Sequence, residues 1–139
     1  MKNNRKLLVI GALACVVSIS AMATSAPKPA DDHYKNLQVL PKNTTEAQMN
    51  KIMVGEFEDA LGVSCGFCHA ANKDGDGLDY VSDTKPEKQI ARQMLRMTLS
   101  LNREYFKIDT PMVGTANIVI TCNTCHKGDT FPDGTGTGQ

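Results

Sequence analysis

Two short motifs of cysteine and histidine constrain this chain more than any other feature of its 139 residues. They read Cys65-Gly66-Phe67-Cys68-His69 and Cys122-Asn123-Thr124-Cys125-His126. The C-x-x-C-H spacing is the attachment pattern of haem c, in which two thiols add to the two vinyl groups of one haem and the histidine supplies an axial nitrogen to the iron. The two copies therefore predict two covalently bound haem c groups, each with its own cysteine pair and its own histidine ligand.

Other chemistries also use paired cysteines, and each of them explains less of the pattern. A four-cysteine zinc site accepts two C-x-x-C pairs but gives no reason for a histidine after each pair. A thioredoxin-like redox site requires one motif on a βαβ scaffold, and the sequence predicts no such scaffold. Two disulfides, the usual expectation for four cysteines in an exported protein, would bind nothing. Haem attachment accounts for both motifs completely.

The first 23 residues have the pattern of a secretory signal peptide. Lys2, Arg5 and Lys6 precede an apolar stretch, and the small-x-small sequence Ala21-Met22-Ala23 fits a signal peptidase site. We therefore predict cleavage after Ala23 and a periplasmic location. An uncleaved membrane anchor is the weaker alternative, because the apolar stretch is short for a bilayer span. Lipidation at Cys15 is disfavoured because apolar residues continue beyond it.

Removal of this leader would leave the chain slightly acidic. The whole chain has 15 basic and 15 acidic residues. The leader contains three of the basic residues and no acidic one, so 12 basic and 15 acidic residues remain, a net charge of −3. Without a basic stripe, nothing indicates a nucleic-acid partner. Since a chain this short builds only a small core from its own side chains, a cofactor-filled interior is favoured.

The remainder of the chain divides into three parts. Residues 24–43 contain three prolines and are predicted to be an N-terminal linker and lead-in segment. Residues 44–128 are predicted to form the dihaem cytochrome c domain. Residues 129–139 are rich in Gly and Thr and are predicted to be a flexible tail.

Each attachment motif follows a predicted amphipathic helix. The first helix has Thr44 or Thr45 as its N-cap and Gly62 as its stop. Its apolar residues recur every three or four positions, as expected of a buried helical face: Met49, Ile52, Met53, Phe57, Ala60 and Leu61. The second helix begins at Pro86 and has the apolar series Ile90, Met94, Met97, Leu101 and Tyr105. The predicted fold class is therefore mainly α, a small multihaem cytochrome c fold of two helix–loop–C-x-x-C-H units with little regular β structure.

Several residues could supply the second axial ligand of each iron. His33 is the one other histidine, and two irons cannot both take it. Methionine is the next candidate, and His/Met ligation raises the potential of a haem. The chain after the leader offers Met49, Met53, Met94, Met97 and Met112. Helical spacing does not choose between Met49 and Met53, or between Met94 and Met97.

From about Tyr34 to Gly128 the chain resembles the cytochrome c subunit family of photosynthetic reaction centres and its small non-photosynthetic relatives. Three segments carry the resemblance: residues 61–65 before the first motif, residues 91–98 with Asn102 and Tyr105 in the second helix, and residues 121–128 around the second motif. In that family a methionine within the helix before each motif binds the iron. By position, the resemblance implies Met53 for the first haem and Met94 for the second. Photosynthetic members have four haems whereas this chain has two motifs, so the resemblance does not imply photosynthesis.

These features predict an electron carrier and not an enzyme. If both irons have two protein ligands, substrates cannot reach the metal, and electron transfer is the remaining chemistry. The expected partners are other redox proteins of an electron-transport chain, and a membrane redox complex remains an alternative setting. The competing hypothesis is a peroxidase-like enzyme or a gas sensor with one open iron, for which His33 would be the distal residue.

Overall fold

The computed structural model describes residues 34–133. The predicted signal peptide, residues 24–33 with His33, and the end of the predicted tail lie outside the described residues. The described part is mostly helical, and its two strands, β1 (Ala70–Ala71) and β2 (Leu78–Asp79), form one short antiparallel pair with Ala70 opposite Asp79. The expectation of a mainly helical chain with little β structure is confirmed.

The first helical segment runs without a break from residue 46 to residue 61. It consists of α2 (Glu46–Lys51), the π-helix η1 (Ile52–Glu58) and α3 (Asp59–Leu61). Thr45 is the N-cap and forms a capping box with Gln48, and the left-handed Gly62 ends the segment with φ of 66°. Both predicted boundaries are confirmed. The π-helical turns were not predicted; π-helices are rare and occur frequently at functional sites, and this one includes Met53.

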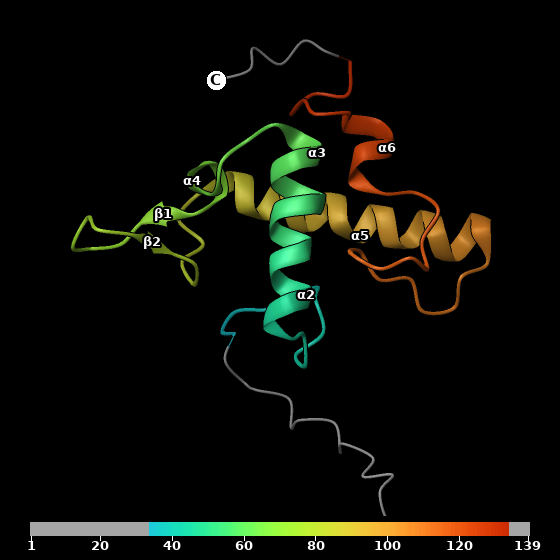
Figure 1. Ribbon diagram of the computed structural model, residues 1–139, viewed down its shortest axis with the longest axis horizontal. Helices are drawn as coiled ribbons and strands as arrows, with labels where there is room; N and C mark the ends of the chain where they lie inside the picture. Colours follow the sequence, from blue (N-terminus) through green and yellow to red (C-terminus); the bar gives the residue numbers. More distant parts are fainter. Residues whose placement is uncertain (1–33, 134–139) are drawn as a thin grey trace, which may run out of the picture.

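The second helix, α5 (Pro86–Phe106), is a regular α-helix of 21 residues with Pro86 in its first turn. It lies across the first helical segment (Figure 1), and Ile52 of η1 packs with Leu95 of α5 and Val113 in a small apolar core. The predicted apolar series is not the face that is buried. The side chains of Ile90, Met94, Met97 and Tyr105 are exposed, and α5 buries Lys88, Arg92, Leu95, Thr98 and Asn102 instead.

The two attachment motifs form short helices in different parts of the molecule (Figure 1): one contacts α5, and the other contacts α3 and η1. The first motif forms α4 (Cys65–Cys68), and the second forms α6 (Cys122–His126). The chain after α6 contacts the end of the first helical segment, where the Gly128 backbone N–H donates to the Ala60 carbonyl over 2.9 Å. The end of the domain therefore packs against the end of its first helix.

Candidate functional site

The first attachment motif is fixed to the beginning of α5. Lys85, the residue that precedes α5, donates from Nζ to the Gly66 carbonyl at 2.5 Å and to the Phe67 carbonyl at 3.1 Å. Both carbonyls belong to the C-x-x-C turn. At His69 the backbone leaves the helix and becomes extended. Lys85 thus holds the two cysteines at one end of α5, a contact that the sequence alone did not indicate.

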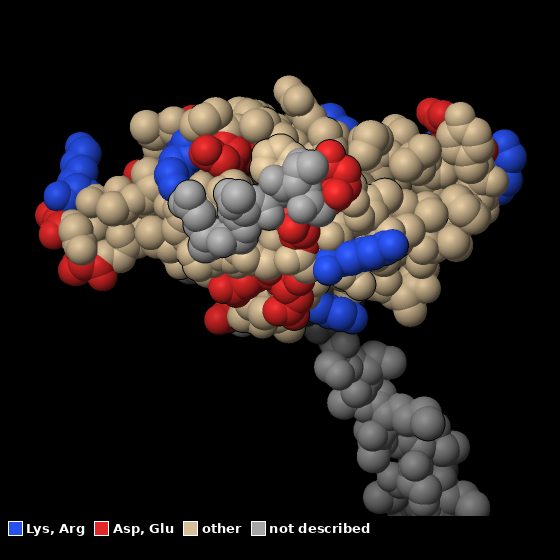
Figure 2. All heavy atoms as spheres, turned by 90° about the horizontal axis from the view of Figure 1, so that it is seen from above, with Lys and Arg blue, Asp and Glu red and all other residues tan. Residues whose placement is uncertain are grey.

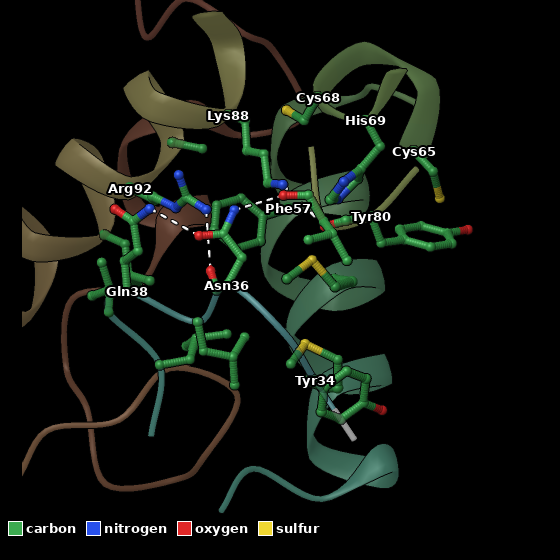
Figure 3. A pocket seen from close by; sticks show the side chains of 18 of the residues that line it. Tyr34, Asn36, Gln38, Phe57, Cys65, Cys68, His69, Tyr80, Lys88 and Arg92 are labelled. Carbon is green, nitrogen blue, oxygen red and sulfur yellow. Dashed lines mark hydrogen bonds between the residues drawn. The ribbon is translucent and has the colours of Figure 1, made fainter. Parts of the chain in front are cut away.

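Beside this motif lies a cavity of about 510 Å³, which is within the usual size range of a cofactor site. Met53, Cys65, Cys68 and His69 all line it, so four of the predicted site residues face one space. Figure 3 shows His69 and the two cysteines on one side of this cavity, with Arg92, Asn36 and Gln38 on another. The predicted lead-in segment forms a further wall through residues 34–40.

His69 has the properties of an imidazole available to a metal. Its Nδ1 atom is buried and has no hydrogen-bond partner within the described chain. Its ring meets the Tyr80 ring edge to face, with the centroids 4.9 Å apart. Burial, followed by the positive charges of Lys88 and Arg92, lowers the pKa of His69. Because a metal binds the neutral imidazole, the surroundings of His69 fit the ligand role that the motif predicts.

The histidine of the second motif has different surroundings from His69. His126 Nδ1 lies 2.9 Å from the Asp129 carbonyl oxygen. If Nδ1 carries the proton and donates this bond, Nε2 is left free, which is the arrangement that outer-shell partners usually give to a metal-binding histidine. Thr121 caps α6, and its side chain accepts the backbone N–H of Thr124. The imidazole is therefore oriented by the chain itself.

Glu56 links the first helical segment to the second motif. One of its carboxylate oxygens accepts the Gly114 backbone N–H at 3.2 Å. Burial raises the pKa of the Cys122 thiol to about 12, and the neighbouring Glu56 carboxylate contributes to the same shift. Met53 and Glu56 belong to the same π-helix, and they face the first cavity and Cys122 respectively.

Asn102 positions the chain just before the second motif. It is fully buried, and its Oδ1 accepts the backbone N–H groups of Val119 at 2.7 Å and Ile120 at 3.0 Å. Its Nδ2 donates to the Ile120 carbonyl at 2.7 Å and to the Thr98 carbonyl at 2.9 Å. Residues 119 and 120 are not in a strand, and the Asn102 side chain holds their backbone.

The methionine candidates differ in position. Met53 is half-buried and, like Met49, lines the first cavity. Met94 and Met97 lie on the exposed face of α5, with 39% and 48% of their surface accessible, and neither lines the first cavity. Met112 is half-buried in the connection between α5 and α6. The structure thus places one predicted methionine together with its cysteines and histidine, and leaves the predicted Met94 on an open helix face.

The alternative chemistries of the cysteines find no support within residues 34–133. All four cysteines in this range are free thiols. The described residues contain no group of three or more His, Cys, Asp or Glu that could hold a metal ion. Nor does the described part include a helix long and apolar enough to cross a bilayer. On the face shown in Figure 2, basic and acidic side chains are interspersed and no basic patch forms.

Comparison with known proteins identifies c-type cytochromes as similar to this chain. A family model described as photosynthetic reaction centre cytochrome C subunit matches residues 1–137. Similar proteins include the photosynthetic reaction center cytochrome c subunit of Roseobacter denitrificans, 32% identical over 74% of this chain and 26% of its own length. Cytochrome c-554 of Chloroflexus aurantiacus is 34% identical over 66% of this chain and 20% of its own length.

A further relative is the photosynthetic reaction center cytochrome c subunit of Thermochromatium tepidum, 27% identical over 92% of this chain and 28% of its own length. The chain thus spans about a quarter of the length of these relatives. No solved structure matches the chain significantly.

Proposed function

Because the chain belongs to the photosynthetic reaction centre cytochrome c subunit family, we propose that it is a periplasmic electron carrier with two haem c groups. One observation carries the proposal: the 510 Å³ cavity is lined by the attachment cysteines, the histidine beside them and a methionine from the helical segment before the motif. A thiol pair for the vinyl groups, a nitrogen ligand and a thioether ligand are what one hexacoordinate haem c requires.

At this first site each residue has a defined role. Cys65 and Cys68 would form the two thioether bonds, His69 would supply the nitrogen ligand, and Met53, which lines the same cavity, would supply the sulfur ligand. When bound, the haem iron provides a one-electron redox couple. The apolar part of the remaining wall includes Val39, Leu40, Phe57 and Leu95. It would limit the access of water to the iron, which together with the axial ligands sets the potential.

At the second site Cys122 and Cys125 form the thioether bonds and His126 supplies the nitrogen ligand, with its Nδ1 directed at the Asp129 carbonyl. We assign Met94 as the sulfur ligand. The assignment follows the family resemblance, and Met94 lies with Ile90 and Met97 on an exposed apolar face of α5. Exposed apolar patches on a small protein indicate a binding site.

The proposed dihaem domain covers residues 44–128, and the cavity contacts of residues 34–40 indicate that the lead-in segment contributes to it. The expected partners are other redox proteins, including a membrane redox complex. Because the chain covers about a quarter of its relatives, their reaction-centre role is not carried over. The alternative of an open-iron enzyme is disfavoured at the first site, where Met53 lines the same cavity as His69.

The intact mass of protein purified from periplasm tests the main proposal. We expect the mass of residues 24–139 plus two haems, which reports leader cleavage and haem number together. A mass equal to that of the bare chain would refute the proposal.

Methionine substitutions test the ligands. Met53→Ala and Met94→Ala should each remove about half of the sulfur-to-iron charge-transfer band of the ferric protein, because one of two irons loses its thioether. Met49→Ala and Met97→Ala are the matched controls and should retain the band. The reverse result at either pair would move the ligand by nearly one helical turn, and a complete absence of the band would favour the open-iron alternative.

A further inference from the structure

The first cavity is lined by two buried cations. Lys88 and Arg92 lie one turn apart on α5, and each exposes only 9% of its surface. Figure 3 shows both side chains beside the cavity, with Asn36 next to Arg92. The other charged residues of the wall are more open to solvent, since Lys35 and Glu46 are exposed and Glu58 is half-buried. Positive charge therefore dominates the desolvated part of the wall.

One carboxylate faces both cations. Asp83 Oδ1 lies 2.9 Å from Arg92 Nη1 and 3.3 Å from Lys88 Nζ, and the other contacts of the two cations are to neutral backbone carbonyls. The Asp83 side chain is 33% exposed, so water screens its charge more than it screens the two cations. The cluster thus holds two positive charges and one negative charge, with the positive charges closer to the cavity.

The net positive charge of Lys88, Arg92 and Asp83 would change the reduction potential of a haem iron bound in this cavity. Oxidation of a haem iron adds one positive charge at the iron, and buried charges act strongly because the surrounding dielectric is low. We infer that Lys88 and Arg92 raise the reduction potential of the haem bound at the first motif, and that Asp83 offsets part of their effect. The inference rests on the proposed function, because it requires a haem in this cavity.

The effect should be confined to one of the two haems. Within residues 34–133, Lys88 and Arg92 are the only charged residues that are buried as a whole, and the half-buried Glu87 has one buried carboxylate oxygen whose negative charge acts on Cys68 of the first motif. The charged side chain that most affects the pKa of Cys122 in the second motif is the carboxylate of Glu56. The second site therefore has no corresponding pair of desolvated cations.

The test is a spectroelectrochemical titration of the holoprotein that resolves both haem potentials. Lys88→Met and Arg92→Gln should each lower one of the two potentials and leave the other unchanged. Asp83→Asn should raise the same potential, because it removes the negative charge from the cluster. Arg92→Lys, which keeps the charge, should restore most of the loss seen in Arg92→Gln. Arg96→Gln removes a charge from an exposed position on the same helix and should have little effect.

The opposite signs expected for Arg92→Gln and Asp83→Asn separate an electrostatic effect from structural damage. If both variants moved the potential in the same direction, or if Arg96→Gln moved it as far as Arg92→Gln, the inference would be wrong. The haem count of the same samples distinguishes a failure of this inference from a failure of the proposed function. Two haems with unchanged potentials would overturn this inference alone, whereas fewer than two haems in the unmodified protein would overturn the proposed function.

Discussion

Asn102 is the residue on which the position of the second motif depends most. Its side chain satisfies two backbone N–H groups and one carbonyl of residues 119 and 120, as well as the Thr98 carbonyl. Substitution by Ala would remove the partner of three part-buried backbone groups of residues 119 and 120, and a backbone group left unpaired away from water costs about 1–3 kcal/mol.

We therefore expect Asn102→Ala to lower the free energy of unfolding by roughly 2–5 kcal/mol, measured by denaturant titration of the holoprotein. Asn117→Ala is the matched control, because the hydrogen bonds of Asn117 are exposed, and it should cost less than about 1 kcal/mol. Equal losses in the two variants would contradict the role given to Asn102.

Asp83 makes stability depend on pH. The hydrogen bond from Asn36, followed by those from Arg92 and Lys88, lowers the pKa of Asp83. A carboxyl group whose folded pKa is depressed stabilises the fold above its unfolded pKa of about 3.9, and this contribution is lost as the pH falls through the lower folded value. The difference in unfolding free energy between the unmodified protein and Asp83→Asn should thus be constant above about pH 5 and shrink in acid. A difference that grew in acid would contradict this assignment.

At the scale of elements, the end of the first helical segment and the chain after α6 approach each other at two glycines. Gly62 has φ of 66°, and a Cβ added there would lie well inside contact distance of the Gly128 carbonyl oxygen. Gly128 has φ of 89°, but a Cβ added there would meet nothing within 4 Å. Gly62 is therefore required both for its left-handed backbone and for the close approach of the Gly128 carbonyl, whereas Gly128 is required only for its left-handed backbone.

Substitution by Ala at both positions separates these reasons. Each variant should lose about 1–2 kcal/mol from the left-handed backbone conformation, and Gly62→Ala should lose more because its methyl group displaces the backbone of residue 128. Thermal unfolding of the two holoproteins gives the comparison. A loss in Gly128→Ala equal to or larger than that in Gly62→Ala would show that the two segments do not meet as described.

The sequence predicted those parts of the elements that depend on local interactions. The Thr45 cap, the Gly62 stop and the Pro86 start were readable because each acts within one helical turn. The buried face of α5 was predicted wrongly, because the partners of Arg92 lie at positions 36 and 83 and those of Asn102 at positions 119 and 120, which no local pattern reveals. No residue type marked the π-helix, so the turn that contains Met53 was also missed.

At the scale of the whole molecule, the chain has little core of its own. The buried hydrophobic residues of the described part are Met49, Ile52, Ala60, Leu95 and Val113. The first cavity, at about 510 Å³, lies beside this small cluster. The sequence anticipated a cofactor-filled interior from chain length and from the two motifs, but which methionine shares a cavity with His69 depends on how the helices cross and became visible only in the fold.

We expect a chain without haem to be largely unfolded, since so few apolar residues cannot offset the conformational entropy of folding. Replacement of all four motif cysteines by Ala should abolish the cooperative unfolding transition and most of the helical circular dichroism. The double variant Cys122→Ala/Cys125→Ala, which keeps the first site, should retain an intermediate amount of helix. A quadruple variant with the stability of the holoprotein would contradict this expectation.

The contact between Ala60 and Gly128 also has a consequence for the time at which the domain can fold. It joins residues 68 positions apart in the chain (128 minus 60), and contacts between distant residues are slow to form because a long loop must close first. The first helix therefore gains this neighbour only when the residues that follow the second motif are in place.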